Sequence, residues 1–521
     1  MSTLCKIYSF VSRHLLKEVE EIRKDPLPFQ AKTFTHLIQN GEKTLFGKGH
    51  HLHATIRLHD FQKQIGLHQY DDLLPYVEQI RTGTQDVLWN QPVRWFAQSS
   101  GTGGTKSKYI PVTHEALRQC HYKGMRTVVA VYLDNYPDSR FLQGKGLTLG
   151  GSCKVDERGD GKARYGDLSA VLLSNSPQWT EWIRTPPRRM VLQDDFEKKI
   201  GEIAPYIATQ NITNFSGVPS WNLVLLRKLL DYTGKNNILE LWPNLELFIH
   251  GGISFAPYRE QYRQLIPSPQ MHYMETYNAS EGFFALQDDP SDNGMLLLPN
   301  CGVFYEFIPL KRLREAIDGA YFDFETMEHV QKGVDYAMVI STNGGLWRYM
   351  IGDTVRFTSL FPHKVIITGR TKLFINAFGE ELMIDHAEKA LVESCNAHNA
   401  TISDFTVAPI FMDRQAKGAH EWLIEFEVPP ADLTLFAADL DSALCRYNSD
   451  YEAKRAHNAT MFPLKLHVLE RGCFYLWMEQ KNQLGGQHKV PRLHQARAHI
   501  EELLAINAIL AAKLNNLNPK H

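Results

Sequence analysis

Apolar positions in the first part of the chain recur at the spacing of amphipathic helices. Residues 1–26 show this spacing and end at a proline, which cannot continue a helix. Helical spacing persists through the first ninety residues, and a long helical pattern runs from about His114 to Tyr132. Residues 222–234 form another helical pattern that closes on Gly234, a residue typical of helix C-termini. The pattern therefore predicts several well-defined helices in this part of the chain.

Short apolar runs with the length of buried strands follow in the middle of the chain. Such runs occupy 245–252, which ends in paired glycines, and also 334–341, 354–358 and 364–368. Because these strands alternate with helices, we predict an α/β class for this region, with mixed, mainly parallel sheets.

The pattern changes near residue 370, where a smaller α+β region begins. We expect a helix at 385–395, a strand at 421–428, a helix at 431–447, strand signals at 464–477 and a helix at 495–515. The predicted organisation is an N-terminal domain of residues 1–368, a boundary at 369–372 and a smaller C-terminal domain of residues 373–521.

The length of the chain agrees with a protein of two or three domains. The chain has 521 residues, of which 43% are hydrophobic and 22% are charged. Its 56 basic and 58 acidic residues give a net charge of -2, which favours neither nucleic acid nor an anionic membrane as a partner. Any binding of phosphate must therefore come from a local site.

The seven cysteines are scattered and form no C-x-x-C pair, so the sequence predicts neither a disulfide framework nor a zinc ribbon. No run approaches the ~18 apolar residues that a membrane-spanning helix needs. The start of the chain does not have the pattern of a signal peptide. We expect a cytoplasmic protein, and the sequence does not indicate its oligomeric state.

The strongest local candidate for phosphate binding is the loop at residues 99–108, which reads SSGTGGTKSK. Its glycines allow several backbone N–H groups to point at one anion, while its hydroxyls and lysines add donors and positive charge. The spacing does not fit the G-x-x-x-x-G-K-[ST] pattern of a P-loop. The same composition is typical of a flexible surface loop, so the loop alone leaves both interpretations open.

Two later segments each contain an acid suited to nucleotide binding. The first is 277–282, with Glu281, and the second is 348–357, with Asp353. One carboxylate could help to hold Mg²⁺, which prefers oxygen ligands, and the other could accept hydrogen bonds from ribose hydroxyls. Taken singly, Glu281 is more typical of a capping or ion-paired acid, and Asp353 is more typical of a turn after Gly352.

Together and in this order, the three segments resemble the nucleotide motifs of the auxin-responsive acyl acid–amido synthetase family. That family is part of the adenylate-forming superfamily, with acyl-CoA ligases, adenylation domains and luciferases. The loop matches the family pattern at Ser99, Ser100, Gly101, Thr102, Lys108 and Pro111, and departs from it at Gly103 and Thr105. The second segment matches at Tyr277, Ser280 and Glu281, with Ala279 in place of a serine. The third matches at Tyr349, Gly352 and Asp353, with Met350 in place of an arginine.

The resemblance extends over most of the chain, through segments 250–262, 367–382, 451–455 and 466–493. The first of these includes Gly251 and Gly252, where the superfamily places a glycine-rich strand end beside adenine. The second resembles the hinge and the start of a mobile C-terminal domain. Because 279–282 reads Ala-Ser-Glu-Gly and several plant-type insertions are missing, the chain looks similar to a bacterial-type member.

The resemblance implies a site for ATP and Mg²⁺. It assigns Ser99, Ser100, Gly101 and Thr102 to the phosphates, with Lys108 as the catalytic cation. Glu281 is the implied catalytic acid that holds Mg²⁺, Asp353 fixes the ribose and Tyr277 stacks on adenine. The implied nucleotide-binding set is completed by Gly251, Gly252, Ser280 and Arg370.

Lys489 is a separate catalytic candidate. It follows two glycines near the C-terminus, where adenylation domains of the superfamily have a lysine that reaches the α-phosphate. A solvated surface lysine is the alternative interpretation, and the sequence leaves both open.

The implied reaction activates a small carboxylic acid as its acyl-adenylate and then transfers the acyl group to an amine, an amino acid in the plant relatives. Dividing acyl transfer into two steps avoids oxide as a leaving group. An acyl-CoA or carrier-protein ligase would share the first step and form a thioester. A non-catalytic binding protein on the same scaffold is the third reading, although Glu281 and Asp353 are both present.

Overall fold

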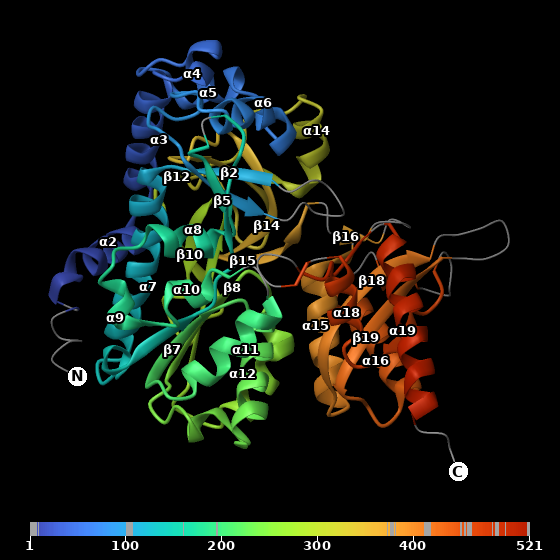
Figure 1. The fold of residues 1–521 in the computed structure, drawn as a ribbon. Helices are drawn as coiled ribbons and strands as arrows, with labels where there is room; N and C mark the ends of the chain where they lie inside the picture. Colours follow the sequence, from blue (N-terminus) through green and yellow to red (C-terminus); the bar gives the residue numbers. More distant parts are fainter. Residues whose placement is uncertain are drawn as a thin grey trace. The chain divides into compact units, whose positions relative to one another are not determined.

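The computed structural model describes residues 8, 10–99, 108–159, 161–193, 196–371, 374–375, 380, 382–410, 418–448, 451–452, 455, 461–481, 483–484, 489–494 and 496–517. These residues form two compact units (Figure 1). The first unit contains the described residues up to 253 together with 265–367, and the second contains 254–264 and the described residues from 368 onward. Segment 254–264 is thus grouped with the C-terminal part of the chain.

Amphipathic helices begin the first unit, as their apolar spacing predicts. In α2 (Arg13–Lys24) the buried residues Leu15, Val19 and Ile22 recur at intervals of four and three, so they line one face. Helix α2 ends just before Pro26, and α3 (Leu27–Gly41) begins directly after it. Three further helices complete this region: α4 (Leu45–Gly49), α5 (Leu58–Gln64) and α6 (Tyr70–Arg81).

An eleven-stranded mixed sheet forms the centre of the first unit, with strand order β12-β13-β14-β15-β11-β10-β9-β8-β7-β3-β6. Its parallel half contains β3 (Lys145–Thr148), β6 (Arg184–Thr185), β7 (Ile212–Gly217), β8 (Leu247–Gly251) and β9 (His272–Ala279). Antiparallel pairing joins β9 to β10 (Gly282–Leu286), β10 to β11 (Met295–Leu297) and β11 to β15 (His363–Arg370), and it also joins β12 (Val303–Pro309), β13 (Asp335–Thr342) and β14 (Tyr349–Leu360). The predicted α/β class with mixed sheets is confirmed, and parallel pairing is confined to the half that has crossover helices.

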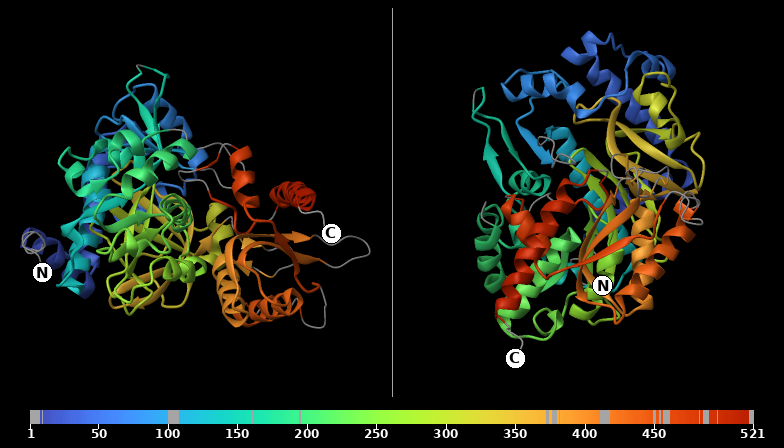
Figure 2. Two further views of the ribbon diagram at one scale, coloured as in Figure 1. Left: turned by 60° about the horizontal axis from the view of Figure 1, so that its bottom comes forward. Right: turned by 90° about the vertical axis from the view of Figure 1, so that its right-hand side faces the viewer.

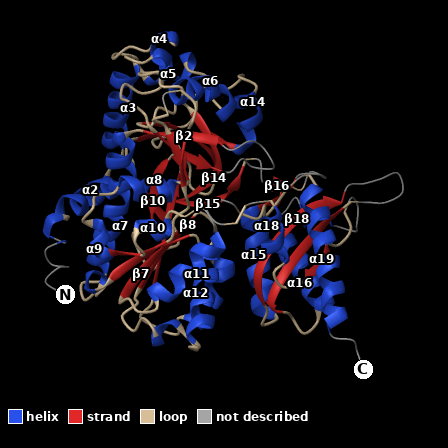
Figure 3. Ribbon diagram, in the orientation of Figure 1, coloured by secondary structure: helices blue, strands red, loops and turns tan. Residues whose placement is uncertain are grey.

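Two helices of this α/β region, α7 and α12, lie close to the predicted ranges. Helix α7 (Tyr122–Asn135) continues a π-helical turn at Ala116–His121 and packs beside α2. Helix α12 (Pro219–Thr233) packs beside α11 (Phe196–Ile207) (Figure 3). It ends on Gly234, whose φ of 66° is the left-handed cap that glycine favours. Helix α8 (Leu168–Asn175) packs on a separate four-stranded sheet. That sheet has the order β2-β1-β5-β4, with β1 at Trp95–Ser99, β2 at Lys108–Val112, β4 at Cys153–Val155 and β5 at Arg164–Gly166.

The second unit is a three-stranded sheet between two pairs of helices. Strands β18 (Thr401–Ile410) and β19 (Ala419–Val428) are antiparallel, and β20 (Lys465–Leu469) is parallel to β19. Helices α15 (Ile384–Ala397) and α16 (Leu433–Tyr447) pack together, as do α18 (Cys473–Gln480) and α19 (Ala498–Leu517), and the left view of Figure 2 shows the sheet between the two pairs. A smaller C-terminal domain is therefore confirmed.

The strand signal at 464–477 is correct only for its first part. Strand β20 ends at Leu469, and residues from Cys473 onward form helix α18 instead. The carboxylate of Glu425, on β19, accepts the backbone N–H groups of Gly472 and Phe474 at 3.0 and 3.2 Å. This long-range cap satisfies donors at the helix start, and the local apolar run contains no sign of it.

Candidate active site

The β1–β2 hairpin holds both ends of the glycine-rich loop. Strand β1 (Trp95–Ser99) pairs with β2 (Lys108–Val112), and the last pair of the ladder is Ser99 with Lys108. Ser100, Gly101 and Thr102 lie outside the described residues. The Lys108 ammonium donates a hydrogen bond to the hydroxyl of Tyr349 at 3.2 Å. The hairpin therefore fixes both ends of the loop, and the residue at one end is Lys108, the predicted catalytic cation.

The end of strand β8 is a bare stretch of backbone at Gly251. A Cβ atom on Gly251 would lie 2.4 Å from the carbonyl oxygen of Thr276 on β9, so no side chain fits there. The Thr276 hydroxyl donates to the carbonyl of His250 at 3.2 Å and thereby joins the two strand ends. The close approach of β9 therefore requires a glycine here, at the strand end where the resemblance implies the adenine side of the site.

Tyr277 and Asp353 form a buried pair between strands that are not neighbours in the sheet. The Tyr277 hydroxyl donates to Oδ2 of Asp353 at 2.8 Å, and the two side chains are 3% and 6% exposed. The Tyr277 ring also lies edge-on to Phe284, with ring centroids 4.9 Å apart. The pair brings two of the three motifs together across 76 residues of sequence.

A β-bulge in β14 sets the direction of Asp353. Met350 pairs with Val339 and Thr354 pairs with Ala337, so the intervening residues of β14 outnumber those of β13. Gly352 lies inside this bulge with a φ of 94°, which glycine adopts readily and other residues avoid. Bulges are common next to active sites because they redirect a side chain.

The turn between β9 and β10 contains Ser280 and Glu281. Ser280 is only 4% exposed, and its hydroxyl has no hydrogen-bond partner among the described residues. Buried polar atoms normally have a partner, so a bound polar group would satisfy this hydroxyl. Glu281 is half-buried at the same turn. The turn therefore fits the presence of a polar ligand.

The described residues contain no group of three or more His, Cys, Asp or Glu side chains arranged to hold a metal. Mg²⁺ keeps several waters and binds one or two carboxylates together with substrate phosphates. Glu281 could supply one such carboxylate.

In the second unit, Arg370 ends β15 and is half-buried, while Lys372 of the predicted hinge lies outside the described residues. Lys489 is also half-buried, directly after the undescribed residues 485–488. The segment that follows Lys489 is tied to β18: the Val407 N–H donates to the Arg492 carbonyl at 2.9 Å. The Arg492 guanidinium also donates to Asp404, to the Phe405 carbonyl and to the hydroxyl of Tyr258. Lys489 thus has a fixed anchor on its C-terminal side.

Sequence reasoning missed Arg348, which supports the third motif. Arg348 is fully buried and has a φ of 39°, unusual for a residue other than glycine. Its guanidinium donates to the buried carboxylate of Glu306 at 3.0–3.2 Å. It also donates to the carbonyls of Gln62, Ile65 and Phe322. Its position directly before Tyr349 was the available signal, but complete burial of an arginine is not visible in a sequence.

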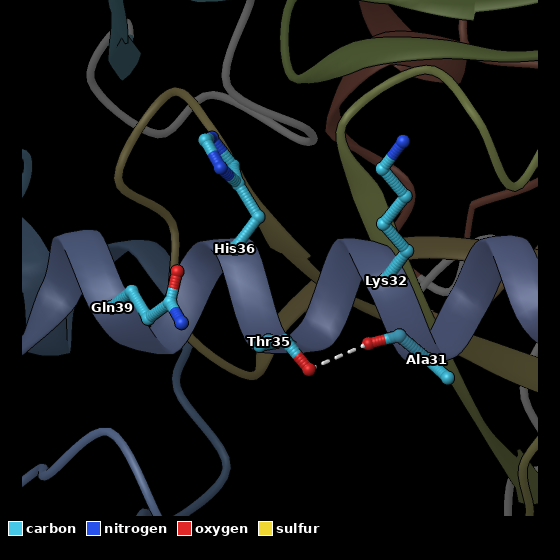
Figure 4. Close-up of a pocket in the computed structure, with 5 residues that line it drawn as sticks. All are labelled: Ala31, Lys32, Thr35, His36 and Gln39. Carbon is cyan, nitrogen blue, oxygen red and sulfur yellow. Dashed lines mark hydrogen bonds between the residues drawn. The ribbon is translucent and has the colours of Figure 1, made fainter.

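A shallow hollow on helix α3 is unrelated to these motifs (Figure 4). Its lining residues are Ala31, Lys32, Thr35, His36 and Gln39. The His36 ring nitrogen lies 2.6 Å from Glu115, and this hydrogen bond raises the pKa of His36. None of the predicted site residues contributes to this hollow.

Bare backbone beside a buried tyrosine–aspartate pair and a lysine at the foot of a glycine-rich loop are features suited to binding a nucleotide. The fold points the same way. The structure of GH3.15 acyl acid amido synthetase aligns with a TM-score of 0.76 at 18% identity, covering 94% of this chain and 95% of that one. A structure of 2-hydroxyisobutyryl-CoA ligase aligns with a TM-score of 0.60 at 12% identity, covering 93% and 91%. The fold is therefore that of the adenylate-forming enzymes.

Three family models match consecutive parts of the sequence: the GH3 family N-terminal domain at residues 15–271, the central domain at 295–370 and the C-terminal domain at 385–498. The chain belongs to the GH3 family, and the predicted family is confirmed. Among its relatives, indole-3-acetic acid-amido synthetase GH3.8 of Oryza sativa subsp. indica is 23% identical over 83% of this chain and 82% of that protein. Indole-3-acetic acid-amido synthetase GH3.4 of Arabidopsis thaliana is 22% identical over 92% and 91%.

No helix among the described residues combines the length and apolarity needed to cross a bilayer.

Proposed function

We propose that this chain uses ATP to convert a small carboxylic acid into its acyl-adenylate and then transfers the acyl group to the amino group of an amino acid. Its relatives are named as amido synthetases, which supports an amide product. The observation that carries the proposal is the buried hydrogen bond between Tyr277 and Asp353, because it joins two nucleotide motifs. The bare strand end at Gly251, directly beside Thr276, supports the same site.

In the first step the substrate carboxylate attacks the α-phosphorus of ATP, and pyrophosphate leaves. Catalysis of this step needs alignment of the reacting groups and stabilisation of charge at phosphorus. We assign the loop residues Ser99, Ser100, Gly101 and Thr102 to the phosphates, with Lys108 as the side-chain cation. Glu281 is the proposed ligand of Mg²⁺, which neutralises phosphate charge when it is bound.

The nucleoside is held by the strand ends and the buried pair. Asp353 accepts hydrogen bonds from the ribose hydroxyls, and its carboxylate is oriented by the Tyr277 hydroxyl. Gly251 and Gly252 offer backbone to the adenine ring, against which Tyr277 stacks. Ser280 gains a partner for its buried hydroxyl, and Arg370 contributes a donor at the end of β15.

Lys489 acts in the first step only, where it stabilises charge on the α-phosphate. The second step is attack by the amine on the carbonyl of the acyl-adenylate, with AMP as the leaving group. We propose that the C-terminal domain turns about residues 369–372 between the two steps, as the family resemblance implies.

A thioester-forming ligase is the second candidate, because the fold also aligns with 2-hydroxyisobutyryl-CoA ligase, at a TM-score of 0.60. The two candidates share the first step and differ in the acceptor. Mass spectrometry of the product separates them: an amide supports the amido synthetase, and a thioester formed with coenzyme A contradicts it.

The first step is tested by ATP–pyrophosphate exchange with a panel of aryl, indolyl, jasmonate-like and fatty acids. Exchange should require both an acid from the panel and Mg²⁺. Acids that support exchange are then incubated with each of the common amino acids, and the products are identified by mass. Folded protein that gave no exchange with any acid would contradict the proposal.

A further inference from the structure

The Lys108 side chain lies between two tyrosines of the first unit. Its ammonium nitrogen is 5.7 Å from the ring centroid of Tyr349 and 5.9 Å from that of Tyr70. It also donates a hydrogen bond to the Tyr349 hydroxyl at 3.2 Å. A lysine has a long flexible stem and a compact charge, so a partner at the ammonium decides where that charge is placed.

Both tyrosines are themselves held in place. The Tyr70 hydroxyl accepts the backbone N–H of Tyr109, the residue after Lys108, at 2.8 Å. Burial raises the pKa of Tyr70 to about 12, so its hydroxyl stays neutral near pH 7. Tyr349 is fully buried and pairs with Ile340 of β13, while the next residue, Met350, donates to the carbonyl of His68 at 2.8 Å. The hydroxyl that meets Lys108 thus projects from rigid backbone.

Tyr349 and Asp353 lie on the same strand, β14: Tyr349 precedes the bulge and Asp353 lies within it, directly after Gly352. Asp353 is the proposed ribose ligand, and Lys108 is the proposed phosphate ligand. One strand therefore fixes a group for each end of the nucleotide. Tyr349 therefore belongs to the site, although the motif that contains it assigned it no function.

We propose that Tyr349 is a positioning residue that acts through Lys108: its hydroxyl holds the ammonium at the foot of the glycine-rich loop, where it meets the phosphates of ATP. The inference rests on the proposed function. A preplaced charge needs no reorganisation as negative charge develops during adenylation. Without the hydroxyl, the ammonium loses one of its partners and is less often in the productive position.

Tyr349→Phe removes only the hydroxyl and keeps the ring. We expect acid-dependent pyrophosphate exchange to fall about tenfold in kcat, the scale of one hydrogen bond to a charged group. Acyl transfer from preformed acyl-adenylate should remain close to the wild-type rate, because pyrophosphate has already left. A purely structural role would slow both half-reactions together.

Tyr305→Phe is the matched control. Tyr305 is also fully buried in the first unit, and its hydroxyl donates to the carbonyls of Phe284 and Leu298 at 3.4 and 3.3 Å. Tyr305→Phe should lower the melting temperature by about as much as Tyr349→Phe does, without changing the rate of pyrophosphate exchange. If Tyr305→Phe slowed exchange as much as Tyr349→Phe, the effect would belong to the fold and the inference would be overturned.

The decisive test is the double variant with Lys108→Ala. Lys108→Ala alone should slow exchange about a hundredfold. If Tyr349 acts through Lys108, adding Tyr349→Phe should cause no further loss. Additive losses, or a normal rate in Tyr349→Phe alone, would overturn the inference while leaving the proposed function intact. A wild-type protein without any exchange would instead remove the proposed function itself.

Discussion

The site residues of the first unit and Lys489 of the second unit are held in different ways. Tyr277 and Asp353 lie on two non-neighbouring strands of the central sheet, are nearly inaccessible to solvent and fix each other by a hydrogen bond. Lys489 lies outside any helix or strand and is half-buried, and the segment that follows it is tied to β18. A rigid group suits a ligand present in both half-reactions, since the adenosine moiety stays bound throughout. A group on a less regular segment suits a charge that is needed in one half-reaction.

The largest effect should come from Lys489→Ala. Loss of one well-placed electrostatic group should slow adenylate formation by about a hundredfold. Transfer from preformed acyl-adenylate to the amine should stay nearly normal, because the α-phosphate no longer accumulates charge. Rapid-quench measurement of each half-reaction tests this difference.

Lys481→Ala is the control for that comparison. Lys481 forms an exposed ion pair with Glu502 at 2.8 Å in the same unit, and such pairs contribute little. It should leave both half-reactions unchanged. Equal damage to both half-reactions in Lys489→Ala would assign that lysine a structural role, and no damage would make it a surface lysine.

Asp353→Ala should have the next largest effect. It removes a charged hydrogen-bond acceptor worth roughly 1.5–3 kcal/mol, so ATP affinity should fall about ten- to hundredfold. Binding of the carboxylic acid should change far less. Calorimetric titration with ATP and with the carboxylic acid substrate measures the two affinities separately. The control is Asp335→Asn, which alters an aspartate that is paired with Arg356 on the neighbouring strand. Unchanged ATP affinity in folded Asp353→Ala would exclude Asp353 from ribose binding.

Tyr277→Phe tests the hydrogen bond between Tyr277 and Asp353, because it removes the hydroxyl and keeps the ring. The Asp353 carboxylate then loses a donor, and we expect the KM for ATP to rise about tenfold, the scale of a hydrogen bond to a charged group. Because the ring remains, any stacking on adenine should persist. A KM unchanged from wild type would show that the pair does not orient Asp353 for the nucleotide.

The smallest effect should come from Ser280→Ala. Its buried hydroxyl has no partner among the described residues, so its removal should not lower the free energy of unfolding. If a bound nucleotide satisfies the hydroxyl, the KM for ATP should rise about threefold. Ser341→Ala gives the contrast: the Ser341 hydroxyl accepts the backbone N–H of Arg348 at 3.0 Å, and its loss should cost about 1–3 kcal/mol. A destabilised Ser280→Ala with normal ATP use would contradict this prediction.

Much of the fold was predictable because it depends on local spacing. The helices that end near Pro26 and on Gly234 have both an apolar face and a terminating residue, and the structure confirms them. The helix at Cys473–Gln480 was wrongly predicted as a strand, because its start depends on a carboxylate 49 residues away from the amide it caps. Periodicity carries no information about such a partner.

The candidate site was likewise predictable only in part from the sequence. Motif spacing selected Tyr277 and Asp353 separately, but their contact across 76 residues needed the folded sheet. The redirecting bulge at Gly352 depends on how β14 pairs with β13 and is likewise invisible in the sequence. The individual roles of the site residues, and the hinge at 369–372, remain predictions.

The buried guanidinium of Arg348 also has a consequence for how the chain folds during synthesis. Its acceptors include the carbonyls of Gln62 and Ile65, which are 286 and 283 residues earlier in the sequence. Those carbonyls leave the ribosome long before Arg348. Glu306 supplies the opposite charge, but the remaining guanidinium donors stay without these acceptors until both ends of the first unit have met. Contacts of such long range are slow to form. We therefore expect nascent chains that end before residue 348 to be cleaved readily by protease around residues 58–65, and chains that extend beyond residue 370 to be protected there.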